Sequence, residues 1–344
     1  MDAALSVVVP VLDEAPRLPQ LIAALQAQED IRLVVVLADG GSRDGSRELG
    51  RRCGARVVAA PAGRGAQMNA AARLCDTPYL LFLHADSRLT RRDQLARAVA
   101  ALERERSHDG RVAGHFPLRF ERGRAGQRWL YRYMEAKTAL NRASTFNGDQ
   151  GLLIATDFFR ALGGFDERLP FLEDQRLGAR IRERGRWITL PDPLITSARR
   201  FETEGPYRRY LLMALIMGCE ATGLEEFFAY APDAYRRQAR ARRLRIAPFI
   251  QTIGHCLHRR PRAERRRLWR AAGAYAGANA WQPFFLLDVL SGRAPGRTPC
   301  LDAFDRHLSA RLSRPRLEAA LGLLTRFWVL GVLRAYFRWS EPAA

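Results

Sequence analysis

Apolar runs alternate with amphipathic segments through the first ninety residues of the chain. Residues 6–11 (SVVVPV), 33–38 (LVVVLA) and 79–83 (YLLFL) are nearly continuous apolar runs. Such runs are typical of strands that are buried on both faces of a sheet. Between the first two, residues 18–28 repeat apolar side chains at helical spacing. The repeated order of strand and helix predicts an α/β, Rossmann-like fold with a mostly parallel sheet and helices on both faces.

The second half of the chain has a different pattern. It is mixed up to residue 200 and becomes largely helical beyond Glu204, with apolar runs at 210–217, 281–290 and 321–339. We therefore expect an α/β domain over residues 1–205 and a mainly helical C-terminal region over residues 206–344. No stretch approaches the roughly 20 uncharged apolar residues that a membrane span needs. The first apolar run also lacks a basic leader, so a cytoplasmic location is expected.

The charge of the chain suits anionic partners. Its 56 basic residues against 36 acidic ones give a formal net charge of +20, and all but one of the basic residues are arginine. Nucleotide phosphates, acidic phospholipids and nucleic acid are all compatible with such a surface. The five cysteines are odd in number and form no CxxC pair. They indicate reduced thiols in a cytoplasmic protein rather than a disulfide framework or a zinc site.

Two acidic motifs follow the first two predicted strands. Residues 10–14 (PVLDE) run from Pro10 to Glu14, and residues 39–46 (DGGSRDGS) begin with Asp39. A carboxylate at a strand end can accept hydrogen bonds from a base or a ribose, and glycines let the backbone approach a ligand closely. The alternative is structural, with the glycines and Asp44 forming a turn and a helix cap.

Two further motifs add basic and acidic groups. Residues 63–69 (GRGAQMN) contain Arg64, Gln67 and Asn69 at a loop-to-helix junction, where backbone N–H groups can bind an anion. Residues 83–86 (LHAD) end the third apolar run, and the Asp86 carboxylate there can ligate Mg²⁺ or Mn²⁺ beside diphosphate oxygens. The alternatives are a turn with a solvated arginine, and a helix cap made by His84 and Asp86.

The last group of motifs lies between residues 148 and 201. Glu173 and Asp174 precede a helical pattern, where an N-cap is the structural alternative. Asp149 and Gln150 lie in a GDQG segment that we place on the acceptor side, with a turn before a strand as the alternative. An ARRF segment containing Arg199 follows.

Taken in this order, the motifs resemble those of the family 2 glycosyltransferases, which have the GT-A fold. The resemblance extends over roughly residues 5 to 201 and is closest to a bacterial branch with LHAD and GRAxQMN motifs. It implies that the segment from Pro10 to Glu14, together with Asp39, holds the nucleotide. It also implies that Arg64 assists with the base or phosphates and that Asp86 binds the divalent cation, Mg²⁺ or Mn²⁺. We assign Gln67, Asn69 and His84 to the same donor site.

The resemblance further implies that Asp174 is the general base, with Glu173 beside it on the acceptor side. The segment containing Arg199 would steady the diphosphate or the acceptor. His84 stands where the wider family has an aspartate, although the LHAD branch shares this feature. The ARRF segment lacks the glutamine and tryptophan of the processive synthases. The expected enzyme is therefore an inverting, non-processive, metal-dependent glycosyltransferase that uses a nucleotide diphosphate sugar and an acceptor hydroxyl, lipid-linked or small.

Three other classes of protein fit the sequence less well. A sugar nucleotidyltransferase usually carries a glycine-rich loop with a basic residue directly after the first strand, where this chain has PVLDE. A non-catalytic basic nucleic-acid-binding protein would show steeply salt-dependent binding. It would leave Asp39, Asp86 and Asp174 without a role. A degenerate transferase that serves as a scaffold is disfavoured because the acidic motifs are intact.

The final apolar run combines aromatic and basic side chains. The residues concerned are Trp328, Tyr336, Phe337 and Trp339 with Arg326, Arg334 and Arg338. This combination suits peripheral contact with an anionic membrane at the inner face. A packed core helix whose arginines extend to solvent is the competing interpretation, and it is the one favoured here.

Overall fold

The structure is a computed structural model that describes residues 4–124, 126–169, 171–236, 238 and 243–341. By its internal contacts the chain forms two compact units. The first comprises Met1–Glu121 with Met134–Ser197, and the second comprises Arg122–Tyr133 with Ala198–Ala344. The first unit is α/β and the second is helical. The expectation that a catalytic domain ends at residue 205 stays a prediction.

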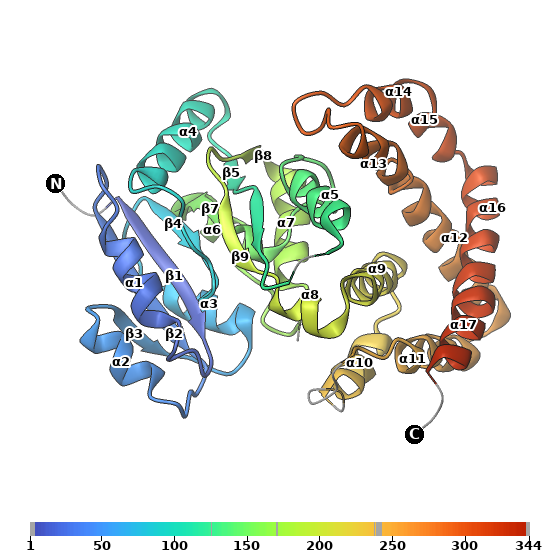
Figure 1. Ribbon diagram of the computed structural model, residues 1–344, viewed down its shortest axis with the longest axis horizontal. Helices are drawn as coiled ribbons and strands as arrows, with labels where there is room; N and C mark the ends of the chain where they lie inside the picture. The colour runs from blue at the N-terminus through green and yellow to red at the C-terminus, as the bar shows by residue number, and fades with distance from the viewer. Residues whose placement is uncertain (1–3, 125, 170, 237, 239–242, 342–344) are drawn as a thin grey trace. The chain divides into compact units, whose positions relative to one another are not determined.

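A seven-stranded sheet forms the centre of the first unit, in the order β3-β2-β1-β4-β7-β5-β8 (Figure 1). Its strands are β1 (Leu5–Val11), β2 (Leu33–Asp39), β3 (Arg56–Ala59), β4 (Tyr79–Phe82), β5 (Val112–His115), β7 (Leu152–Ala155) and β8 (Arg186–Thr189). Strand β7 runs antiparallel to β4 and β5, and every other pair in this sheet is parallel. The expected α/β architecture, a mostly parallel sheet with a mainly helical C-terminal region, is confirmed.

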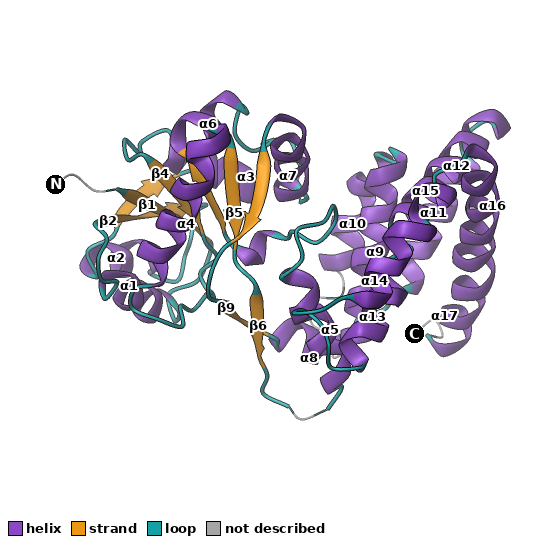
Figure 2. Cartoon of the chain, turned by 90° about the horizontal axis from the view of Figure 1, so that it is seen from above, coloured by secondary structure: helices purple, strands orange, loops and turns teal. Residues whose placement is uncertain are grey.

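Helices enclose the sheet, as Figure 2 shows. They are α1 (Leu18–Gln26), α2 (Ser46–Arg52), α3 (Arg64–Ala72), α4 (Gln94–Asp109), α6 (Thr156–Ala161) and α7 (Glu173–Arg184), with a 3₁₀ turn η1 at Gly148–Gln150. The crossovers from β1 to β2 and from β2 to β3 step in one direction, and their helices α1 and α2 contact each other. The crossover from β3 to β4 runs in the reverse direction across the sheet. Because crossovers between parallel strands are right-handed, α3 lies on the face of the sheet opposite to α1 and α2.

The core of this unit follows from the apolar runs. The side chains of Leu5, Val7, Val8 and Val9 are fully buried, as are those of Leu80 and Leu81 in β4. Because strands flanked by helices on both faces bury every side chain, these segments are continuously apolar rather than alternating.

The segment of residues 111–120 (RVAGHFPLRF) contains two strands that belong to different sheets. It breaks after β5, and β6 (Leu118–Glu121) pairs with β9 (Leu194–Ser197) in a separate two-stranded parallel sheet. Pro117 lies at the break, where it lacks the N–H group that a continuous ladder would require.

The second unit is built from helices, and α5 (Arg128–Thr138) extends over the division between the units. The others are α8 (Arg199–Glu204), α9 (Pro206–Thr222), α10 (Glu226–Arg236), α11 (Ala247–His258), α12 (Arg262–Ala278), α13 (Gln282–Leu290), α14 (Pro299–His307), α15 (Ser309–Leu312), α16 (Pro315–Arg326), the π-helix η2 (Phe327–Leu333) and α17 (Arg334–Ser340). Glu341, just after α17, accepts hydrogen bonds from the N–H groups of Ile246 and Ala247 and pairs with the buried Arg208. These contacts hold the end of the chain against the start of α11.

Helices α16, η2 and α17 form one continuous helix from Pro315 to Ser340. By length and composition alone, this 26-residue helix is apolar enough to cross a membrane, because its most apolar 18-residue window has a mean hydropathy of 1.3. The expectation that no stretch approaches about 20 uncharged apolar residues is not contradicted, because Arg326 and Arg334 interrupt this helix. The expectation of a packed core helix is wrong, because only 17% of its most apolar window is buried. Hydrophobicity alone does not show whether other protein covers a helix.

Candidate functional site

The loops that carry the predicted motifs leave the sheet at one edge. Val11 at the end of β1 pairs with Asp39 at the end of β2, and Phe82 at the end of β4 pairs with Leu152 at the start of the antiparallel β7. The turn that precedes Leu152 therefore lies beside the loop that follows Phe82. This edge is where parallel α/β sheets bind ligands.

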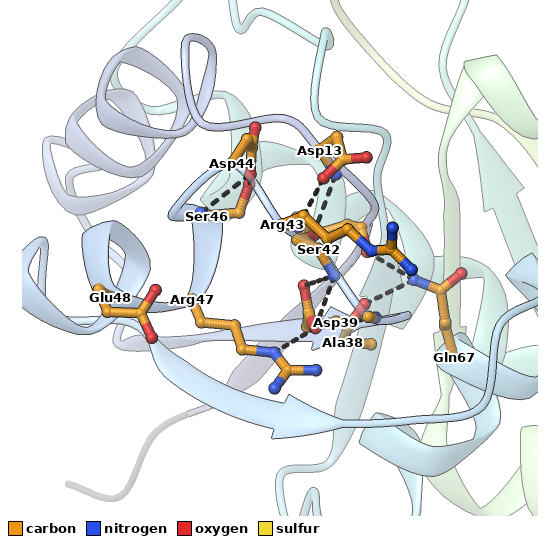
Figure 3. A network of polar contacts seen from close by, with 12 residues as sticks. Asp13, Ala38, Asp39, Ser42, Arg43, Asp44, Ser46, Arg47, Glu48 and Gln67 are labelled. Carbon is orange, nitrogen blue, oxygen red and sulfur yellow. Dashed lines mark hydrogen bonds and ion pairs between the residues drawn. The ribbon is translucent and has the colours of Figure 1, made fainter.

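Asp39 organises its own loop. Its buried carboxylate accepts hydrogen bonds from the N–H groups of Gly41 (2.9 Å) and Ser42 (3.2 Å) and pairs with Arg47 (Figure 3). Burial by itself raises the pKa of Asp39, but the hydrogen bonds from Ser42, Arg47 and Gly41 outweigh it, and the net pKa is lowered. Asp39 is therefore ionised at neutral pH and fixes the shape of the loop.

The PVLDE and DGGSRDGS loops are joined to each other. Arg43 donates its backbone N–H to Asp13, at 2.8 Å, and Asp13 donates its own N–H to the Ser42 hydroxyl (Figure 3). Asp44 accepts the N–H of Ala15 at 2.9 Å. Its hydrogen bond from the Ser46 side chain lowers the pKa of the Asp44 carboxyl. Asp44 therefore stabilises the turn, as the structural alternative predicted.

Two of the predicted donor-site residues lie among these loops. Pro10 pairs with Ala38 in the β1–β2 register. Glu14 forms an ion pair with Arg17 and donates its backbone N–H to Ser46. Both residues therefore lie near the C-terminal ends of β1 and β2, where Asp39 also lies.

Gln67 lies beneath these loops and positions them. Its buried amide nitrogen donates to the carbonyls of Val11 and Ala38, both at 2.8 Å. A Cβ at Gly40 would lie 2.9 Å from the Gln67 amide, so a larger residue there would displace that amide. Gln67 therefore holds the ends of β1 and β2 together as a positioning residue.

Asn69 performs a similar task further along α3. Its side chain accepts the N–H of Phe165 and donates to the Phe165 carbonyl and to Glu167, each at 2.9 Å. Gly164 has a φ of +68°, and a Cβ on it would lie 2.6 Å from the Asn69 oxygen. Asn69 thus holds the segment of residues 163–167 (GGFDE) against α3.

The N-terminal ends of α3 and α7 lie close together. Arg64, the first residue of α3, lies 3.8 Å from the carboxylate of Glu173, the first residue of α7. A Cβ at Gly65 would lie 3.4 Å from that of Glu173. Both helix ends present backbone N–H groups and the positive end of a dipole, which favour an anion.

Glu173 is the buried acid of the site. Only 3% of its side chain is exposed, and its Oε1 has no hydrogen-bond partner among the described residues. Burial raises its pKa and the neighbouring Asp174 charge raises it further, while Arg64 and His84 oppose the shift. A proton is therefore held more tightly on Glu173 than on an ordinary glutamate.

His84, Asp149 and Asp174 meet around Gly148. His84 donates from Nδ1 to Asp149 at 2.7 Å, and Asp174 accepts the N–H of Gly148 at 2.6 Å. A Cβ at Gly148 would lie 3.1 Å from Asp174 Oδ2 and 3.3 Å from His84 Nε2. The backbone of Gly148 thus separates the side chains of His84 and Asp174.

Asp86 lies two residues beyond His84 and is half-buried. No hydrogen bond or ion pair joins its carboxylate to another residue in the described part of the chain. Within those same residues, no group of three or more His, Cys, Asp or Glu side chains is arranged to hold a metal alone. A cation at Asp86 would therefore need oxygens from its substrate as further ligands.

The sequence did not point to His115, which supports the Gly148 turn. His115 is fully buried at the end of β5, and its Nδ1 lies 2.9 Å from the amide nitrogen of Gln150. That nitrogen also donates to the carbonyl of Thr138 at 3.0 Å. Gln150, predicted on the acceptor side, is thus a buried support. Arg47 was also missed, because an arginine on an exposed helix face has no distinguishing sequence signal.

Arg199 begins α8 and belongs to the second unit, whereas the other predicted site residues belong to the first. On that unit, Phe201 packs edge-on against Tyr131 at 6.4 Å. A role for Arg199 at the donor site stays a prediction.

Comparison with known proteins gives one family match. Residues 6–162 match the model of the family described as Glycosyl transferase family 2. This region contains Asp39, Arg64, Asp86 and Asp149 and ends before α7, so Asp174 lies outside it. No curated protein sequence matches the chain.

Several solved structures resemble the chain. A mannosyltransferase, PcManGT from Pyrobaculum calidifontis, solved with GDP-Man and Mn²⁺, is 18% identical, with 95% of this chain and 88% of that chain covered and a TM-score of 0.47. Residues 1–349 of TarS from S. aureus are 13% identical, with coverages of 88% and 91% and a TM-score of 0.47. Glucosyl-3-phosphoglycerate synthase from Mycobacterium tuberculosis is 16% identical, with coverages of 55% and 70% and a TM-score of 0.38.

Proposed function

We propose that the chain, whose residues 6–162 match the model of glycosyl transferase family 2, is a glycosyltransferase that transfers one sugar at a time from a nucleotide diphosphate sugar to an acceptor hydroxyl. The anomeric carbon would be inverted in a direct displacement. One observation carries this proposal: loops distant in sequence, bearing Asp39, Asp86 and Asp149, leave the same edge of the sheet, and Asp174 bonds to the last of them.

The donor would bind across the ends of β1, β2 and β4. The joined PVLDE and DGGSRDGS loops offer a shaped wall for the nucleoside, kept in place by Gln67. The exposed side of Arg64 and the N-terminus of α3 would receive the diphosphate. Arg199 would add positive charge there.

A divalent cation fits this arrangement at Asp86, whose carboxylate has no other partner among the described residues. Mg²⁺ and Mn²⁺ both accept one or two protein carboxylates together with phosphate oxygens. When bound, the ion would neutralise charge on the departing diphosphate. The Nδ1 of His84 already donates to Asp149, so this nitrogen would not compete with the cation for the Asp86 carboxylate.

Asp174 would accept the proton of the acceptor hydroxyl. The N–H of Gly148 holds one carboxylate oxygen in place, and the side chain remains half-exposed, as a base that meets an incoming acceptor must be. Glu173 is a weaker candidate because its buried carboxyl retains its proton more readily. We propose that the reaction takes place at the cytoplasmic face of the membrane or in the cytoplasm. The five thiols, all of them free, are compatible with that location.

A thermal-shift screen of the full chain against UDP-, GDP- and dTDP-sugars, with Mn²⁺ present, tests donor and metal together. A donor at about one hundred times its Kd adds about 2.7 kcal/mol, which for a chain of this length corresponds to a rise of about 4 °C. Excess chelator and the Asp86→Asn variant should both abolish the rise. Asp76→Asn, at the opposite end of β4, is the matched control and should retain it. The donor assignment fails if no nucleotide sugar shifts the melting temperature, and the metal assignment fails if chelator leaves a shift intact.

A further inference from the structure

The helical unit contains an apolar cavity of about 530 Å³. Helices α9, α11, α12 and α16 line it together with η2. None of the described residues along its wall carries a charge, and the hydroxyls of Thr222, Tyr275 and Thr325 are among its few polar groups. A cavity of this size and character matches an apolar ligand. All of its walls lie within one unit of the chain, so the cavity does not depend on the donor site.

The mouth of the cavity carries exposed apolar side chains. Leu324, Phe327 and Trp328 line the cavity and are 62%, 67% and 51% exposed. Leu323 and Trp339, on the same continuous helix, are 65% and 81% exposed. Large apolar side chains that gather in this way on a soluble surface mark a site of contact with a partner or a lipid.

The charge on this helix indicates which kind of apolar partner it contacts. Between Pro315 and Ser340 there are four arginines and one glutamate. Three of the arginines, Arg326, Arg334 and Arg338, are exposed and form no ion pair with any residue in the described ranges. Exposed aromatic and apolar groups interleaved with unneutralised arginines are complementary to a bilayer interface with anionic headgroups.

We propose that this helix lies on an anionic lipid bilayer and that the cavity takes up one hydrocarbon chain of an anionic phospholipid. A single buried chain anchors a protein only marginally, whereas a chain combined with a basic surface gives stable binding. The cavity and the arginines provide these two contributions. The inference does not rest on the proposed transfer reaction.

The helix lies along the membrane rather than across it. Arg326 stands close to its midpoint, where a charge would be most costly in a bilayer. The opposite side of the helix is already packed against protein, because the backbones of α12 and α16 meet at Gly273 and Gly322. A Cβ at Gly322 would lie 2.2 Å from the Trp269 carbonyl oxygen. A helix packed along one side can offer only its other side to lipid.

A substitution that fills the cavity tests whether the cavity binds a hydrocarbon chain. Gly218 lines the cavity from α9, and a Cβ there meets nothing within 4 Å. Gly218→Phe should therefore fold and occupy part of the space. Gly254→Phe on α11 is the matched control, because Gly254 is equally open but does not line the cavity. With cis-parinaric acid as a fluorescent single-chain anionic probe, the full chain and Gly254→Phe should bind it. Gly218→Phe should bind about tenfold more weakly, the loss expected from excluding about two methylenes. Equal binding by all three proteins, or by none of them, would overturn the cavity assignment.

Sedimentation with vesicles tests the basic surface. The full chain should bind vesicles that contain phosphatidylglycerol in preference to neutral phosphatidylcholine vesicles. Arg334→Gln/Arg338→Gln should weaken binding to the anionic vesicles by roughly tenfold to thirtyfold. Arg51→Gln/Arg52→Gln, which removes the same charge from α2, should weaken it less. Equal losses in the two variants would mean that net charge alone drives binding, and retention after alkaline carbonate washing would mean that the helix crosses the bilayer. Either result would refute the proposed docking.

Discussion

The buried imidazole of His115 should make the first unit sensitive to acid. Its ring lies among the aromatic rings of Phe146 and Trp187, with centroids 6.0 and 5.7 Å away, and its Nε2 has no partner among the described residues. Burial, with a smaller contribution from the positive charge of Arg182, lowers the pKa of His115 from 6.5 to about 4. The neutral ring is therefore the form that fits the fold.

The sign and size of the effect follow from proton linkage. Between pH 6.5 and pH 4 the unfolded chain binds a proton at this histidine and the folded chain does not, so the free energy of unfolding falls as the pH falls. A shift of about 2.5 units at about 1.36 kcal/mol each corresponds to a loss of about 3 kcal/mol over this window. Above pH 6.5 both states are neutral and the contribution is constant.

The variant His115→Phe keeps a ring in the cavity and removes the titration. At pH 7 it should be about 1 kcal/mol less stable, because Gln150 loses one hydrogen-bond partner. At pH 4 it should be more stable than the unchanged protein. His258→Gln removes an exposed histidine from α11 and should leave the stability of the first unit as it was.

Hydrogen exchange followed by mass spectrometry reads the peptides of β4, β5 and β7 separately from the helical unit. After correction for the intrinsic effect of pH on exchange, the opening free energy of these peptides should fall with pH in the unchanged protein. The part of this fall that comes from the titration of His115 should be absent from the variant His115→Phe. Parallel pH profiles for the two proteins, or a His115 resonance that titrates near pH 6.5 in NMR spectra, would refute the linkage.

Three further substitutions test the site. Asp174→Asn should lower kcat by 10² to 10⁴ with little change in melting temperature, because an amide oxygen can still accept the Gly148 N–H; near-normal turnover in a steady-state assay would remove Asp174 as the base. Glu173→Gln should raise stability at neutral pH, since the raised pKa means that ionisation of the buried acid opposes folding. Its advantage should shrink as the pH falls towards 4.5, and denaturant titrations that show no such trend would contradict the assignment. Asn69→Ala leaves both polar groups of the Phe165 backbone without their side-chain partner and should cost about 2 to 4 kcal/mol of unfolding free energy. A cost below about 1 kcal/mol in the same titration would mean that water replaces the side chain.

The sequence by itself determined the local elements of the first unit. The apolar runs at 6–11, 33–38 and 79–83 became β1, β2 and β4 with bounds shifted by a residue or two. The amphipathic segment at 18–28 became α1. Strands covered on both faces are continuously apolar and helices covered on one face repeat every three to four residues, so each pattern is contained in a short window.

The carboxyl edge of the sheet could also be anticipated. Parallel strands that alternate with helices place their C-terminal ends together, so loops that follow successive strands become neighbours whatever their sequence separation. Asp39 and Asp86 each follow a predicted strand, and the structure places the loops that carry them at this edge.

Only the tertiary structure decided how the remaining site residues come together. Strand β7 enters the sheet antiparallel between β4 and β5, which brings Gly148 beside His84 and gives His115 its contact with Gln150. Such pairings join residues tens of positions apart and leave no periodicity in either strand. The continuous helix from Pro315 to Ser340 is a similar case, because its composition suits a core, a bilayer or a surface equally well. Exposure depends on which other segments cover a helix, and that is settled by packing across the whole unit.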